Sequence, residues 1–506
     1  MSALWEAVCL FVKTMPNESA VIGHDEMLTW SALKQRVNSL AEELDSLSGQ
    51  VLALYADNSP DWIAVDLACH IANITLLPLP RFFSKQQLTH AIKESGATAI
   101  IMAAAAADAD ADAADEGDQG KLSDYIKGKQ VDISSSYSSL VLSETGQKKA
   151  VNIPEETQKI TFTSGSTGQP KGVCLSRSSQ INTSQALISA TGLSDIKHLA
   201  ILPFSTLLEN IAGIYAPLLT GGKIIALPQD RLGFNGSQGF NLGTLLDVIT
   251  TYQPSSFILL PELLTAILGA IEQGWKVPDS INFIAVGGSK VSQNLLQQAQ
   301  AVDLPVYQGY GLSECGSVVS LNTPKQSNIS ATGQVLKHLK VTIEEGEVVV
   351  YDNTFLGYID QQSTWNQNKV YTGDLGFYDE QGYLHITGRK KNVLVSSFGR
   401  NISPEWPESE LLANGLLSQC VVFGDAAPFC IALVTPRHSE TSEQDIQRWV
   451  DEVNKCLPDY AQVRAWRQLS KPLTVKDGLI TSNGRPVREK IMQYNQDIIQ
   501  QFYQGE

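Results

Sequence analysis

The stretch TSGSTGQPKG at Thr163–Gly172 is the most informative segment of this 506-residue chain. Its glycines let the backbone turn with positive φ and approach a ligand closely. Successive N–H groups in such a turn form a nest for anions, to which the neighbouring hydroxyls add further donors. Lys171 supplies a mobile positive charge near the end of the loop. The composition therefore suits a polyphosphate, although an ordinary glycine-rich surface hairpin would use the same residues.

The loop does not have the Walker arrangement of phosphate-binding residues. That pattern requires Gly-Lys-Ser/Thr beginning five residues after the first glycine. Counting from Gly165, position 170 is a proline and Lys171 is followed by Gly172. A kinase or nucleoside triphosphatase of the P-loop type is therefore disfavoured.

Short apolar runs alternate with helical patterns on both sides of this loop, which predicts βαβ units and mainly parallel sheets. Before the loop we expect strands and helices at Val51–Leu54, Trp62–Ala72, Leu76–Pro78, Lys85–Glu94 and Ala97–Met102. From the loop onward we expect them at Ile160–Thr163, Arg177–Thr191, Leu199–Leu202, Leu207–Leu219, Ile224–Leu227, Leu245–Thr251, Ser256–Leu260, Glu262–Gln273, Phe283–Val286, Gln293–Ala301 and Val306–Gln308.

The C-terminal part of the chain has a different pattern. Residues 331–387 carry short alternating strands, typical of a small β-barrel or distorted sheet. Beyond them, strands at Cys420–Phe423 and Cys430–Val434 mix with helices at Gln444–Cys456 and Arg488–Gln501. The predicted fold is therefore α/β, with a large N-terminal domain at 1–388 and a smaller α+β domain at 389–506. The N-terminal domain is expected to hold two doubly wound sheets and the barrel-like subdomain.

The overall charge limits the classes of partner. The net charge is −16, and a non-specific nucleic-acid binder would need a basic face instead. A single nucleotide needs only a few local cations and N–H groups, so nucleotide binding remains compatible. Ala103–Asp118 is a low-complexity Ala/Asp run that predicts an exposed insertion, and the Ser- and Lys-rich block at 130–151 also predicts surface.

The cysteines and the N-terminus indicate the compartment. Seven cysteines stand at long spacings without a CxxC pair, which favours reduced thiols and a cytoplasmic protein over a disulfide framework or zinc site. The N-terminus lacks the basic and apolar regions of a signal peptide. We expect no transmembrane helix, because no run of about 18 apolar residues occurs.

Three further segments give the loop a context: Tyr310–Glu314 (YGLSE), Tyr371–Asp374 (YTGD) and Gly388–Asn392 (GRKKN). In order and spacing, the four segments resemble the adenylate-forming superfamily of acyl-CoA synthetases, peptide-synthetase adenylation domains and luciferases. The resemblance extends from LTWSAL at 28–33 to NGRPVR at 483–488. It implies a mobile C-terminal domain and a two-step reaction in which ATP activates a carboxylic acid as an acyl-adenylate.

The resemblance also implies roles for individual residues. Glu314 would help to bind Mg²⁺, Ser313 would keep the hydroxyl of the usual threonine, Asp374 would accept the ribose hydroxyls, and Lys391 would be the hinge. The β- and γ-phosphates would be held by Thr163, Ser164, Gly165, Ser166, Thr167, Gly168 and Lys171. The residues that would contact the nucleoside and the α-phosphate are Gly287, Gly288, Ser289, Tyr310, Gly311 and Arg389. The residues that would contact the carboxylic acid are Thr206 and Gly309.

Two positions depart from the family pattern. The C-terminal Asn-Gly-Lys motif of the family is Asn483-Gly484-Arg485 here, so Arg485 stands where the adenylation lysine is expected. Arginine keeps the charge but is bulkier, planar and forked, so the change is not neutral at a positioned site. Thr206 stands where the family usually carries an aromatic or histidine residue near the acid's carboxylate.

The segments LPFSTLLENIAGIYAPLLTGG and GRKKNVLVSSFGRNISPEWPE resemble most the long-chain fatty acyl branch. We therefore expect a fatty-acid ligase that passes its product to CoA. Two alternatives stay open: transfer to a separate acyl or peptidyl carrier protein, and a catalytically weakened member that binds nucleotide. The sequence does not indicate the oligomeric state.

Overall fold

The computed structural model describes residues 3–103, 131–133, 140–147, 151–163, 170–234, 239–481 and 484–503. Three features of the sequence lie outside these ranges. They are the loop residues Ser164–Gly168, the Ala/Asp-rich segment after Ala103, and Asn483 of the C-terminal motif. The loop's two ends, Thr163 and Lys171, are described.

The first sheet has four parallel strands at its centre and antiparallel strands at both edges. The strands that flank the predicted phosphate loop, β8 and β9, are antiparallel neighbours and together form a hairpin. In spatial order the strands are β19 (Gly357–Tyr358), β9 (Lys171–Ser176), β8 (Thr157–Thr163), β4 (Thr75–Pro78), β3 (Val51–Tyr55), β5 (Ala99–Ala103), β7 (Leu140–Glu144) and β6 (Val131–Asp132).

The second sheet is built mainly from the middle of the chain, but its far edge comes from the N-terminus. Val21 pairs in parallel with Ile224, so the first hairpin of the chain joins this sheet and not the first one. In spatial order its strands are β16 (Gln334–Val335), β15 (Ser320–Leu321), β14 (Val306–Tyr310), β13 (Phe283–Val286), β12 (Ser256–Leu259), β10 (Lys197–Leu199), β11 (Lys223–Ile225), β1 (Ser19–Ile22) and β2 (Met27–Thr29).

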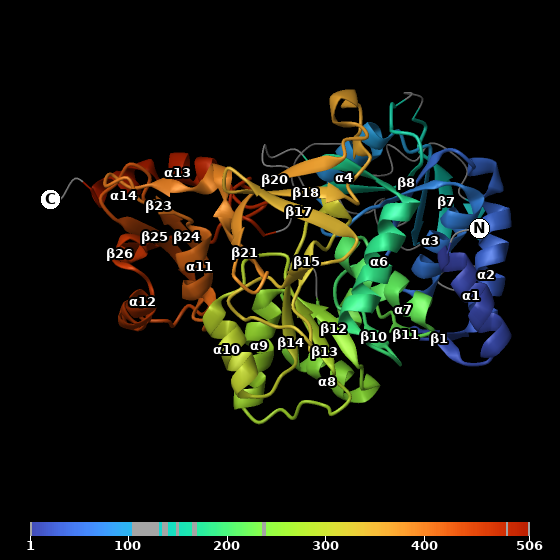
Figure 1. Ribbon diagram of the computed structural model, residues 1–506, viewed down its shortest axis with the longest axis horizontal. Helices are drawn as coiled ribbons and strands as arrows, with labels where there is room; N and C mark the ends of the chain where they lie inside the picture. Colours follow the sequence, from blue (N-terminus) through green and yellow to red (C-terminus); the bar gives the residue numbers. More distant parts are fainter. Residues whose placement is uncertain are drawn as a thin grey trace.

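Three smaller sheets follow. The segment predicted to be a small barrel or distorted sheet forms a four-stranded antiparallel sheet of β17 (Leu339–Glu344), β18 (Glu347–Asp352), β20 (Lys369–Tyr378) and β21 (Leu384–Arg389). The C-terminal part holds a hairpin of β22 (Leu394–Val395) and β23 (Asn401–Ile402), and a sheet of β24 (Leu417–Phe423), β25 (Cys430–Pro436) and β26 (Val463–Gln468). Figure 1 shows this part, in orange and red, standing at one end of the molecule beyond β21.

The helices begin where the sequence supplies caps. Ser59, Ser176, Ser292 and Ser442 each accept a hydrogen bond from a backbone N–H of the first helical turn. No helix in the described ranges is long and apolar enough to cross a membrane. The α-helices are α1 (Ala3–Thr14), α2 (Trp30–Glu43), α3 (Pro60–Ala72), α4 (Lys85–Ser95), α6 (Arg177–Thr191), α7 (Ala216–Thr220), α8 (Leu242–Tyr252), α9 (Pro261–Glu272), α10 (Gln293–Ala301), α11 (Glu405–Leu412), α12 (Glu443–Cys456), α13 (Arg488–Tyr494) and α14 (Gln496–Gln501).

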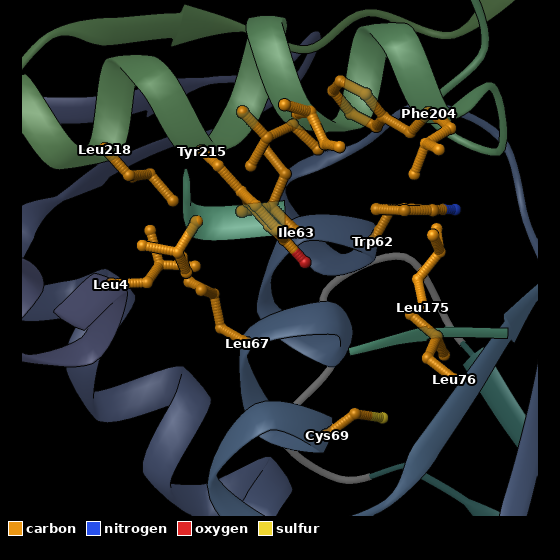
Figure 2. Packing of buried hydrophobic residues seen from close by; sticks show 14 of the residues in the cluster. Leu4, Trp62, Ile63, Leu67, Cys69, Leu76, Leu175, Phe204, Tyr215 and Leu218 are labelled. Carbon is orange, nitrogen blue, oxygen red and sulfur yellow. The ribbon is translucent and has the colours of Figure 1, made fainter. Parts of the chain in front are cut away.

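The core of the N-terminal part surrounds helix α3, whose residues are buried from Pro60 to His70. Figure 2 shows Trp62 beneath the ring of Phe204, with Leu76 and Leu175 of the first sheet below it. The rings of Trp62 and Phe204 lie 5.2 Å apart. A helix that is buried around its whole circumference must be covered on all sides. Helix α3 therefore lies in a shared layer between the two large sheets.

A buried ion pair lies within this layer. Lys159 of β8 is 1% exposed, and its Nζ lies 3.0 Å from Asp66 Oδ1. Asn210 and Tyr215 also donate to the Asp66 carboxylate, each at 2.9 Å. Burial raises the pKa of Asp66, but the charges of Lys159 and His70 outweigh it and lower the pKa below its ordinary value. The pair fastens the strand before the phosphate loop to the helices behind it, because buried charges are tolerated only with such partners.

The structure corrects several element predictions. The predicted helix at Leu207–Leu219 is a π-helical segment, η3 (Glu209–Tyr215), followed by α7, because Glu209 and Asn210 turn inward to bind His198 and Lys159. The predicted helix at Arg488–Gln501 breaks at Asn495. The strand predicted at Leu199–Leu202 runs from Lys197 to Leu199. The block at 130–151 is not all surface, since β7 is largely buried between β5 and β6.

Candidate active site

Three predicted nucleoside residues meet in one cluster. Tyr310, at the end of β14, donates its hydroxyl to Asp374 Oδ2 at 2.6 Å. Arg389, at the end of β21, places Nε 2.7 Å from Asp374 Oδ1. Asp374 and Arg389 are register partners across β20 and β21. Antiparallel pairing therefore brings YTGD and GRKKN together, although they stand well apart in the sequence.

Asp374 is 3% exposed, so its charge depends on these neighbours. Burial raises the pKa of Asp374, while Arg389, the Tyr310 hydroxyl and Arg485 each offset part of the rise. The same burial, with Asp374 next in effect, raises the pKa of Tyr310 well above its usual value. Tyr310 thus remains a hydrogen-bond donor, and Asp374 is a carboxylate whose ionisation its cationic neighbours support.

The predicted glycines line the ends of β13 and β14, where side chains would not fit. A Cβ on Gly311 would lie 1.7 Å from the carbonyl oxygen of Ser317, and one on Gly287 would lie 3.0 Å from that of Gly309. Gly288 has φ of +85°, a conformation that glycine adopts without strain. The absence of side chains at these positions therefore lets neighbouring parts of the chain pack closely against the two strand ends. Ser289 follows, with an exposed side chain.

Arg485 reaches this region from the C-terminal part of the chain. Its Nη2 donates to the carbonyl oxygen of Gly288 at 3.0 Å. Partial desolvation and then the charge of Arg389 lower the pKa of Arg485, while Asp374, Glu405 and Glu314 raise it. An arginine remains charged under such shifts. The expected adenylation position is therefore occupied by a cation that already has a backbone partner.

The second cluster lies at the phosphate hairpin. Lys171 begins β9 opposite Thr163, and its Nζ lies 5.1 Å from the centre of the Tyr358 ring. Tyr358 donates its hydroxyl to Glu314 Oε1 at 2.8 Å. Pro170 is fixed by His90, whose Nε2 lies 3.0 Å from its carbonyl oxygen. The two predicted phosphate-end residues are thus linked through one tyrosine.

The residues around Glu314 fit Mg²⁺ better than a metal held by protein alone. In the described ranges, no group of three or more His, Cys, Asp or Glu side chains gathers to hold a metal ion. Among the described residues, the hydrogen bond to the Glu314 carboxylate comes from Tyr358 and goes to Oε1. No described residue donates to the other oxygen, Oε2. Mg²⁺ prefers one or two carboxylates, with phosphates and waters completing its shell. Glu314 provides such a carboxylate, and Ser313 lies half-buried beside it in the turn η6 (Ser313–Cys315).

Some predicted residues join neither cluster. Thr206 lies ahead of η3, where its backbone N–H donates to Pro203 and its carbonyl oxygen accepts from Asn210. Gly309 packs against Leu321, 3.1 Å from the position of its hypothetical Cβ. Lys391 lies in the turn η8 (Lys390–Asn392), where burial and then Arg389 lower its pKa.

Sequence reasoning missed three residues at these clusters. Tyr358 contacts both Lys171 and Glu314. Its Gly-Tyr dipeptide is too common in proteins to indicate a functional residue. Glu347 accepts the N–H of Gly373 and the Nζ of Lys390, each at 2.9 Å. Glu410 of α11 accepts the Ser292 hydroxyl at 2.8 Å and the N–H of Gln293 at 3.3 Å, at the start of α10. Each depends on a partner distant in sequence, which no local pattern indicates.

Comparison with known proteins gives this architecture a family. The model named AMP-binding enzyme matches residues 10–359, and the model named AMP-binding enzyme C-terminal domain matches residues 391–506. The first match alone covers more than half of the chain. The chain belongs to the AMP-binding enzyme family, which confirms the predicted superfamily and fold class.

Individual relatives are distant but cover most of the chain. The 2-succinylbenzoate–CoA ligase of Bacillus velezensis is 24% identical over 82% of this chain and 83% of the relative. Long-chain-fatty-acid–CoA ligase 1 of Cavia porcellus is 23% identical over 95% of this chain and 83% of the relative. The structure of o-succinylbenzoate CoA synthetase from Bacillus subtilis with its acyl-adenylate intermediate matches with a TM-score of 0.76, at 19% identity, over 96% of this chain and 97% of that one. This last likeness shows a shared fold.

Proposed function

We propose that this protein is an AMP-forming acid–thiol ligase, which activates a carboxylic acid with ATP and Mg²⁺ and transfers the acyl group to CoA. The observation that carries the proposal is the cluster of Tyr310, Asp374 and Arg389, together with the bond from Arg485 to Gly288. Membership of the AMP-binding enzyme family and the CoA ligases among its relatives support it.

In the first step a carboxylate oxygen attacks the α-phosphorus of ATP, and the bond to the β-phosphate oxygen breaks. The products are acyl-AMP and pyrophosphate. Lys171 and the hairpin from Thr163 would hold the leaving phosphates, and Arg485 would face charge on the α-phosphate. Asp374 would accept the ribose hydroxyls in its ionised form. Mg²⁺ held by Glu314 would neutralise charge on phosphate oxygens.

In the second step the CoA sulfur attacks the acyl carbon, and the bond between that carbon and the AMP oxygen breaks. The products are the thioester and AMP, and the thiol proton passes to solvent. We propose a boundary between 388 and 389, with Lys391 as the hinge of a domain rotation that removes Arg485 from the site. The separate family models over 10–359 and 391–506 support two movable units.

For the substrate we propose a medium- or long-chain fatty acid. Similarity to a long-chain-fatty-acid ligase over 95% of this chain supports it. The main alternative is an aromatic acid of the succinylbenzoate type, since several relatives carry that name. The seven unpaired cysteines fit a reducing compartment, and we propose the cytoplasm.

The test is product analysis by mass spectrometry with ATP, Mg²⁺, CoA and a panel of acids. The panel should contain saturated fatty acids from six to about eighteen carbons, benzoate and 2-succinylbenzoate. Formation of acyl-CoA and AMP from fatty acids is the expected result. Turnover of aromatic acids alone would reject the fatty-acid substrate, and acyl-AMP without thioester would favour a carrier protein as acceptor.

A further inference from the structure

We propose that Tyr358 is a positioning residue that keeps Lys171 and Glu314 apart, so that the cation stays available to phosphate and the carboxylate to magnesium. The inference rests on the proposed function for the identity of the ligands. It concerns a residue to which the four sequence motifs assign no role.

Tyr358 is held firmly by its backbone. Its strand β19 adds to the edge of the first sheet, where Tyr358 pairs with Val173 of β9. Its N–H donates to the Thr364 hydroxyl at 3.0 Å, and its carbonyl oxygen accepts Trp365 Nε1 at 2.8 Å. Gly357 precedes it with φ of +136°, and a Cβ there would lie 2.5 Å from Trp365 Cδ1. The position of the tyrosine therefore does not depend on its hydroxyl group.

The side chain is equally constrained. The ring of Phe355 meets it edge-on, with ring centres 4.8 Å apart. Phe355 is itself tied to the turn of Glu314, because its N–H donates to the Glu314 carbonyl oxygen at 2.7 Å. The Tyr358 hydroxyl is the donor in its hydrogen bond to Glu314, because a carboxylate oxygen accepts.

The ring and the hydroxyl act on opposite charges. The ring lies 5.1 Å from Lys171 Nζ, within the range of a cation–π interaction. The hydroxyl binds Glu314 Oε1 at 2.8 Å and leaves Oε2 for another ligand. Among the described ion pairs, none joins Lys171 to Glu314. A direct pair would neutralise both groups and would have to break before each could bind its own ligand.

This arrangement predicts different effects for hydroxyl and ring. Tyr358→Phe frees the Glu314 carboxylate but keeps the ring beneath Lys171, so binding of magnesium pyrophosphate should weaken about tenfold. Tyr358→Leu also removes the aromatic ring next to Lys171 and should weaken the binding of magnesium pyrophosphate further. Binding of AMP, which needs neither the metal nor the phosphate loop, should stay within about twofold of the unaltered protein in both variants.

The test is calorimetric binding of magnesium pyrophosphate and of AMP to the full chain, with Mn²⁺ resonance spectra as a readout of the metal's ligands. Tyr351→Phe is the matched control, because it removes a tyrosine–glutamate hydrogen bond, to Glu344, on the four-stranded sheet. Kinetics should show a larger rise in KM for magnesium ATP than fall in kcat.

Equal weakening of AMP and pyrophosphate would overturn the inference, since it would indicate a general structural role. Unchanged pyrophosphate binding by Tyr358→Phe would overturn it as well. Tight nucleotide binding by the unaltered protein without acid activation would reject the proposed function alone, and the variant comparison would still decide the role of Tyr358.

Discussion

The two ends of the site are built differently. The phosphate end, with Lys171, Tyr358 and Glu314, comes entirely from N-terminal strands and turns that pack on one another. The nucleoside end includes Arg389, at the proposed domain boundary, and Arg485 from the last part of the chain. The phosphate end thus lies within the proposed N-terminal domain, while the nucleoside end would depend on how the two proposed domains meet. Changes at the first should therefore affect binding and chemistry in every conformation, and changes at the second should affect one step.

The largest effect is expected from removing the charges of the phosphate end. Lys171→Ala and Glu314→Ala should each lower kcat/KM for ATP about 100-fold, since each removes a charge proposed to stabilise the phosphates or the metal. Steady-state kinetics with the best acid measure this. Lys223→Ala is the control, because it removes an exposed lysine whose ion-pair partner is the exposed Glu18. Activities near that of the unaltered protein in both site variants would show that the phosphate end is assigned wrongly.

A smaller and selective effect is expected from Arg485. Arg485→Met should slow acyl-AMP formation about thirtyfold but leave thioester formation from supplied acyl-AMP unchanged, because the cation serves only the first conformation. Pre-steady-state assays separate the two steps. Lys490→Met, five residues further along, is the matched control. Equal slowing of both steps would mean that Arg485 supports the fold or both conformations.

Arg485→Lys sharpens the same comparison, because lysine is the residue that the family motif carries. A faster first step in this variant would show that arginine handicaps adenylation. A slower one would show that the site, including the bond to Gly288, is arranged around the guanidinium.

The third effect is a change in pH dependence. In its proposed role Asp374 accepts the ribose hydroxyls in its ionised form, so ATP binding should weaken as pH falls toward its raised pKa. Arg389 lowers that pKa, and Arg389→Gln should therefore raise it further and move the acid limb of kcat/KM to higher pH. The loss in this variant should be larger at pH 6 than at pH 8. A uniform loss across the pH range would contradict the electrostatic coupling.

The smallest effect is expected at the contact between the two proposed domains. Glu410→Gln removes the negative charge at the N-terminus of α10 while leaving an acceptor for Ser292. It should slow the first step about twofold to threefold, because a charge in this position is worth under about 1 kcal/mol. Glu443→Gln, in the first turn of α12, is the control. A faster first step would show that the contact opposes the adenylating arrangement.

Much of the fold follows from local pattern. The strands Val51–Tyr55 and Phe283–Val286 and the helix Arg177–Thr191 are apolar runs or helical periods bounded by turns and caps, so the sequence predicts them closely. Partner choice over long distances was not predictable. Val21 pairs with Ile224, far away in the sequence, and no local pattern near either residue indicates which sheet the first strand joins.

The candidate site divides in the same way. Asp374 and Glu314 could be named because motifs carry them, but Tyr358 and Glu410 act through partners far away in the sequence. The π-helical turn at Glu209 arises from buried polar contacts that helical periodicity does not register. The sequence therefore predicts the site residues that belong to local motifs. The residues that orient those site residues are identified only from tertiary contacts.

The most direct test of acid activation through an adenylate is the fate of oxygen in a labelled substrate. The acid that turns over fastest is supplied with ¹⁸O in its carboxylate, and the products are analysed by mass spectrometry. The account predicts one ¹⁸O atom in AMP, because the carboxylate oxygen that attacks phosphorus leaves with the nucleotide. Unlabelled AMP, or label in phosphate or pyrophosphate, would contradict it.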